Sequence, residues 1–203
     1  NFITRNPSGE FEFTQKLTTG NYGQFESKTS VDLPKMGPVS ARFSYSSSER
    51  DGYTKNNGAG YTYDLTPYGG GKIKSPKELG GEESTAMFLA VSFDLHDDLS
   101  LVYKYDYNEV DAVPPPVGIL GTSPVLAGLV GAIGFGESLG IPASSAGATL
   151  PDSVANGLHL PSYSEHEGHN LTAEFALSDT VTIRNILSYR EGMSEVPGQT
   201  LDG

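Results

Sequence analysis

The sequence predicts an all-β protein, an antiparallel transmembrane β-barrel portion of about seven strands. From Met87 to Leu95 every second residue is apolar, and the alternation resumes from Leu99 to Tyr107 after a tight turn at residues 96–98. A period of two is typical of a β-strand, because successive side chains point to opposite faces. One apolar face ends in tyrosines and the reverse face carries charges, as in a barrel with lipid outside, a polar lumen and aromatic rings at the interface.

The same alternation predicts the other strands, taken in chain order. The predicted strands cover residues 11–19, 25–33, 39–45, 87–95, 99–107, 171–177 and 181–189. Their lengths approach the roughly nine to eleven residues that a tilted strand needs to cross a bilayer. In the first turn, Gly20–Gly23, the glycines and Asn21 are expected to supply positive φ.

The connections between the predicted strands alternate in length after the first turn. Short turns at residues 34–38, 96–98 and 178–180 are separated by long loops near residues 49–84 and 110–169. Bacterial barrels have short periplasmic turns and longer outside loops. If the three short turns are periplasmic, both long loops fall outside together. A soluble antiparallel sheet with one wet face remains the alternative on pattern alone.

Composition agrees with a barrel and excludes several other classes. The 203 residues carry a net charge of −12, and only 36% are hydrophobic, because half of each spanning strand can be polar. The acidity argues against nucleic-acid binding and against attachment to anionic lipid by charge. The chain contains no Cys, which excludes a disulfide framework.

Three motifs near the start resemble a known family. The segment Asn1–Pro7 reads Asn-Phe-Ile-Thr-Arg-Asn-Pro, the Gly20–Gly23 turn is followed by Phe25, and Ser48–Tyr53 contains Arg-Asp-Gly-Tyr. In this order and spacing they resemble the end of the plug domain and the first barrel strands of TonB-dependent outer-membrane receptors. The motifs cover mainly the first 57 residues, and the rest of the chain matches by strand pattern.

The resemblance implies a function and a domain organisation. Residues 1–8 would be the end of the plug and its linker, and residues 9–203 the N-terminal part of a larger, 22-stranded barrel. Such a receptor imports a scarce nutrient (a siderophore, haem, cobalamin or a carbohydrate) across the bacterial outer membrane. We expect both ends to lie within a longer protein, in which the missing plug region contacts TonB. Outer-membrane lipid, a small-molecule or oligosaccharide ligand and a surface lipoprotein are the other expected partners.

The candidate ligand-binding residues lie in the lumen and in the second long loop. They are Lys104, Asp106, Tyr163, His166 and His169. Solvation of the lumen is the alternative role for each charge. The same applies to the other charges of the predicted lumen face, which are Glu12, Lys16, Lys28, Arg42, Glu174 and Arg184.

The sequence predicts no enzyme, no metal site and no cofactor. There is no Cys and no Gly-x-Ser-x-Gly elbow, and the four histidines are expected in loops or turns. His166 and His169 could share a metal ion on a helical turn, but Gly168 disfavours a helix, so a charged rim is the preferred interpretation. The uncharged segment 112–136 predicts a surface loop with one short helix around Ser123–Ala132.

Two other functions remain open at this point. A released receptor fragment could have a structural, self-assembling β role, since seven strands cannot close a wide barrel and leave two edges free to pair. A barrel-associated lipase or protease is the third hypothesis, and it lacks a triad or a paired acid site.

Overall fold

The computed structural model describes residues 5–117, 152–154 and 156–197. The chain divides into two compact units, and each is described here by itself. The first unit contains residues 1–49, 83–110 and 164–194, and the second contains residues 50–82, 111–163 and 195–203.

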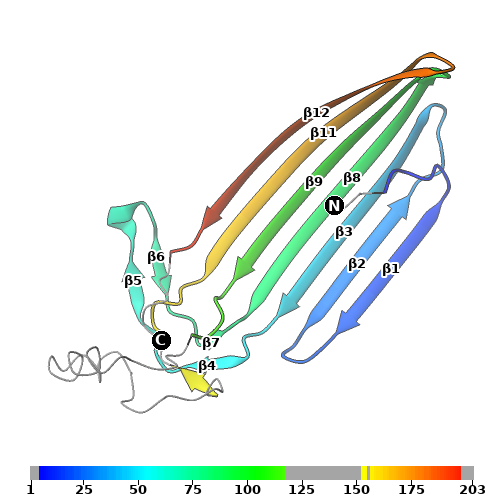
Figure 1. The fold of residues 1–203 in the computed structure, drawn as a ribbon. Helices are drawn as coiled ribbons and strands as arrows, with labels where there is room; N and C mark the ends of the chain where they lie inside the picture. The colour runs from blue at the N-terminus through cyan, green and yellow to red at the C-terminus, as the bar shows by residue number, and fades with distance from the viewer. Residues whose placement is uncertain (1–4, 118–151, 155, 198–203) are drawn as a thin grey trace. The chain divides into compact units, whose positions relative to one another are not determined.

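The first unit is built on one antiparallel sheet whose strands follow chain order, as Figure 1 shows. The order is β1 (Glu12–Thr19), β2 (Phe25–Asp32), β3 (Val39–Arg50), β8 (Glu82–His96), β9 (Leu99–Ala112), β11 (Ser162–Ser178) and β12 (Val181–Glu195). The all-β class and the seven-stranded antiparallel sheet predicted from the alternation are confirmed. Within the described residues, β1 and β12 are the two edge strands.

The strand register places apolar and polar side chains on opposite faces. Phe13 lies opposite Val31, which lies opposite Phe43, and these three form an apolar row across β1, β2 and β3. The neighbouring row joins Glu12, Asp32 and Arg42 on the reverse face. Because the side-chain period is two, the position of one row determines the face on which each remaining residue of these strands lies.

The short connections gather at one end of this sheet. They join β2 to β3, β8 to β9 and β11 to β12, as the alternating loop lengths predict. The Gly20–Gln24 turn is at the opposite end, closed by the Gly20 amide bonding to the Gln24 carbonyl at 2.9 Å. Positive φ in that turn is adopted by Gly23 (64°) and Tyr22 (60°), so the expectation is confirmed for glycine and wrong for Asn21.

The long connections contain regular structure that the sequence pattern did not predict. They form β4 (Thr54–Asn56), β5 (Thr62–Asp64), the 3-10 helix η1 (Thr66–Tyr68), β6 (Lys72–Lys74), β7 (Glu78–Leu79) and β10 (Ser153–Val154). Strand β10 pairs with β4 in parallel, so the two long connections share one small sheet. The second connection also ends earlier than predicted, because β11 begins at Ser162.

Helical structure in the described ranges includes the short 3-10 helix η1. These ranges contain no helix that is long and apolar enough to cross a membrane. The helix predicted around Ser123–Ala132 lies outside the described residues.

The second unit has a core that mixes apolar and polar side chains. Leu79 and Leu160 are fully buried beside Asn56 and Asn156. The Asn56 Nδ2 donates to the Asn156 carbonyl at 3.0 Å, and the Asn56 Oδ1 accepts the Asn156 amide at 3.0 Å. This reciprocal pair ties the first long connection to the second across a sequence separation of 100 residues, and we call it the asparagine clip.

Candidate functional site

The apolar face of the seven-stranded sheet is exposed along most of its strands. Its side chains are large and more than a third exposed, and they are Phe13, Leu17, Phe25, Phe43, Tyr45, Met87, Leu171, Phe175, Leu177, Val181, Ile183 and Leu187. Soluble monomers rarely expose a continuous apolar surface larger than a few hundred Å². This face therefore requires an apolar environment.

The reverse face is polar and carries paired charges. Asp32 and Arg42 form an ion pair between β2 and β3, and the carboxylate of Asp32 is almost fully buried. A second pair joins Glu174 on β11 to Arg184 on β12. Asp106 on β9 contacts Arg190 on β12 at 2.5 Å. The charges predicted for a lumen thus share one face with partners of opposite sign.

The N-terminal segment contacts this polar face near the short turns. The Ser8 amide donates to Asp32 Oδ1 at 3.0 Å, and the Lys35 amide donates to the Gly9 carbonyl at 2.7 Å. A Cβ on Gly9 would lie 3.2 Å from the buried Ser40 hydroxyl. Residues 8–9 therefore cover the side of the sheet opposite the exposed apolar residues.

Three of the five candidate ligand-binding residues lie on the polar face. Lys104 and Asp106 are two residues apart on β9 and therefore share it. A Cβ on Gly168 of β11 would lie 2.8 Å from Asp106 Oδ1 and 2.9 Å from Arg190, so the glycine leaves room for this ion pair. The His166 ring occupies the space beside Gly192 of β12, where a Cβ would clash with it. Arg190 was missed from the sequence, although its even-numbered spacing from Arg184 could have placed it on this face.

His169 lies on the opposite face of β11. Its Nδ1 is 2.7 Å from the Tyr103 hydroxyl, and its ring centroid is 5.0 Å from that of Tyr105. The expectation that the histidines lie in loops or turns is therefore wrong for His166 and His169, which are within β11. Residues three apart on a strand point to opposite faces, so these two cannot share a metal ion. Tyr163, the fifth candidate, belongs to the second unit.

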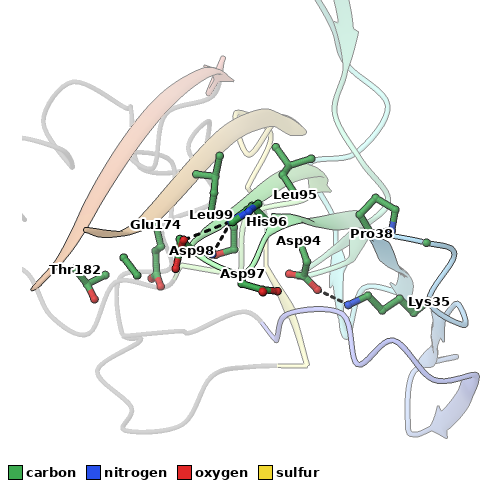
Figure 2. A pocket seen from close by; sticks show the side chains of 13 residues that line it. Lys35, Pro38, Asp94, Leu95, His96, Asp97, Asp98, Leu99, Glu174 and Thr182 are labelled. Atoms are coloured by element: carbon green, nitrogen blue, oxygen red, sulfur yellow. Dashed lines mark hydrogen bonds and ion pairs between the residues drawn. The ribbon is translucent and has the colours of Figure 1, made fainter. Parts of the chain in front are cut away.

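An open hollow of about 890 Å³ lies beside the short turns of the first unit, and Figure 2 shows the side chains that line it. Its carboxylates are Asp94, Asp97, Asp98 and Glu174. Lys35 Nζ contacts Asp94 at 2.5 Å, so part of this negative charge is neutralised. The hollow can hold a polar or cationic group through non-covalent contacts. No local motif indicated it, because its residues come from three separate hairpins.

Comparison with known proteins finds no matching family model and no significantly similar curated protein or solved structure. Within the described ranges, no group of three or more His, Asp or Glu side chains is arranged to hold a metal ion. The function is therefore inferred from the two faces of the sheet, the polar site around Asp106 and the hollow.

Proposed function

We propose that this chain contributes strands to the barrel of a bacterial outer-membrane receptor that imports a scarce nutrient and is energised through TonB. The observation that carries the proposal is the contrast between the two faces of one sheet. The exposed apolar face suits lipid, and the reverse face, with its ion pairs and hollow, suits a hydrated lumen.

The connections support one orientation of this barrel. Three short turns are at one end of the sheet and fit the periplasmic side, while the long connections fit the outside. The contact of Ser8 with Asp32 is on the polar face, which agrees with a chain that enters the barrel wall from a plug in the lumen.

The ligand-binding role proposed for the polar face is non-covalent. Lys104, Asp106, His166 and Arg190 offer charged and hydrogen-bonding groups to a siderophore, haem, cobalamin or a carbohydrate. Charge-assisted hydrogen bonds of this kind are stronger than neutral ones and fix the orientation of a ligand.

The proposal is tested by uptake in cells that carry the full natural protein. Each of the four ligand classes is supplied in labelled form to cells with and without functional TonB. We expect one class to enter only when both the protein and TonB are present, and Asp106→Asn to weaken its binding. A natural protein recovered outside the outer membrane would refute the proposal.

The self-assembling fragment remains the second candidate, and the two sheet edges favour it. Each of β1 and β12 has a neighbour on one side only within the described residues. In an up-and-down sheet of seven strands, however, the first and last strands run in the same direction. Copies in one orientation would therefore close a ring only through parallel pairs, which bacterial single-chain barrels avoid because they have an even number of antiparallel strands. Fibres with a repeat of about 4.8 Å, formed by a natural polypeptide near 21.5 kDa, would favour this candidate.

A further inference from the structure

We propose that two adjacent rows of side chains on the apolar face mark the outer boundary of the membrane. The first row is Tyr105, His169 and Tyr189, whose neighbouring ring centroids are 5.0 and 6.3 Å apart, and the second contains Glu167 and Glu191, with Glu109 further from the short turns on β9. Acyl chains would cover the face between the short turns and the first row, and lipid headgroups would meet the glutamates. This inference rests on the proposed function, and it specifies where lipid ends.

The spacing of the glutamates is the first argument. Leu99, Leu177 and Val181 are the apolar residues nearest the short turns on β9, β11 and β12, respectively. Ten residue steps separate Leu99 from Glu109. The same ten steps separate Leu177 from Glu167, and Val181 from Glu191. Because Glu174 pairs with Arg184, Glu167 lies opposite Glu191 on the neighbouring strand. Because Asp106 faces Gly168, Glu109 lies one residue pair further from the short turns.

The tyrosine hydroxyls supply the second argument. The Tyr107 hydroxyl donates to Glu109 at 2.9 Å, and Tyr189 donates to Glu191. The Tyr105 hydroxyl contacts Glu167 at 3.4 Å. Each hydroxyl is thus directed away from the short turns, while its ring lies nearer the apolar residues. Tyrosines adopt this orientation at membrane interfaces, where one end of the ring is in an apolar layer and the other is in water.

The height of the apolar band is the third argument. Ten residue steps at a rise of about 3.4 Å extend about 34 Å along a strand. A strand tilt of about 40° reduces this to about 26 Å along the barrel axis. The apolar band of outer-membrane barrels is about 25 Å tall, so the glutamates fall just beyond the acyl region.

A lipid bilayer fits this layered order better than a protein partner does. Apolar, aromatic and acidic residues follow one another in this order on three neighbouring strands, and a bilayer has the matching sequence of acyl chains, interface and headgroups. A protein interface over the same surface would bury the glutamates, and an unpaired buried charge is strongly unfavourable.

The test measures the environment of single cysteines, because this chain has no native Cys. In the full natural protein, with any other cysteine replaced, Phe175→Cys and Glu167→Cys carry a nitroxide in outer-membrane lipid vesicles. Ala176→Cys, which lies beside Phe175 and lines the hollow, is the matched control for the polar face. Relaxation by dissolved oxygen and by a water-soluble nickel chelate gives the accessibility ratio at each site.

We expect the oxygen-to-nickel accessibility ratio to be severalfold higher at Phe175 than at Glu167 and Ala176. Equal, lipid-like ratios at Phe175 and Glu167 would overturn the boundary and leave the membrane-facing sheet intact. A water-like ratio at Phe175, or a lipid-like ratio at Ala176, would overturn the boundary and the proposed function together. Glu191→Cys on β12 is the second boundary site, and it decides the outcome if Glu167→Cys fails to insert.

Discussion

Replacing Asn56 with alanine is expected to destabilise the core of the second unit. The Asn56 side chain is 3% exposed. Besides Asn156, it bonds to the Ser75 hydroxyl at 3.3 Å, the Pro76 carbonyl at 2.9 Å and the Gly58 amide at 3.0 Å. Alanine removes every one of these contacts at once and leaves their partners inside the fold.

The cost follows from the buried hydrogen bonds that are lost. The fully buried Asn156 amide bonds to the Asn56 Oδ1, whereas the Asn156 carbonyl also accepts the His159 amide at 3.3 Å and keeps that bond in the variant. A buried polar group that loses its hydrogen bond costs about 1–3 kcal/mol. The loss of the bond to the Asn156 amide therefore costs about 2 kcal/mol, and partners that keep another bond or that water can reach add less.

Amide hydrogen exchange measures this change as a local opening free energy. The Tyr53 amide, which bonds to the Leu79 carbonyl at 2.9 Å, reports on the pairing of this unit. Since about 1.4 kcal/mol corresponds to a factor of ten, its exchange should accelerate about thirtyfold in Asn56→Ala.

The neighbouring residue provides a matched control. Asn57 is exposed, and its Nδ2 makes a bond of 3.0 Å to the Ser153 hydroxyl. Asn57→Ala should therefore cost less than about 1 kcal/mol. Similar exchange rates in the two variants would refute the assignment of the asparagine clip as the element that holds the unit together.

Three further predictions concern other sites. Arg42→Ala leaves the buried Asp32 carboxylate without its ion pair, and should lower the free energy of unfolding by about 3–5 kcal/mol; an unchanged denaturant midpoint would contradict this. Gly52→Ala should destabilise the second unit by about 1–3 kcal/mol, because a Cβ there would lie 2.9 Å from the backbone of β7, and limited proteolysis would detect the loosening. Hydrogen bonds from the Thr66 side chain and backbone lower the pKa of the exposed Asp64 below its ordinary value of 3.8. The stabilisation of the β5–β6 hairpin is then present above pH 3.8 and lost as the pH falls through the lowered pKa; an Asp64 carboxyl titration by NMR with a midpoint at or above 3.8 would contradict the expectation.

Local pattern was sufficient for the sheet and its faces. A period of two is set by the backbone of each strand separately, so Phe13 and Phe43 could be assigned to one face before any pairing was known. The positions of the short turns could be predicted for the same reason, since each turn interrupts the alternation between two neighbouring strands. The long connections were not, because β4 and β7 contain only a few residues each, too few to show a period.

The sequence by itself determined which residues lie on the apolar face of the sheet and which lie on the polar face, and the tertiary structure decided which of them contact one another. Asp106 and Arg190 are 84 residues apart, and the two asparagines of the clip are 100 residues apart. Such partners depend on strand register and on closing long loops, and neither is encoded in a local window. His166 and His169 illustrate the difference, since they are close in sequence but are separated by the sheet itself.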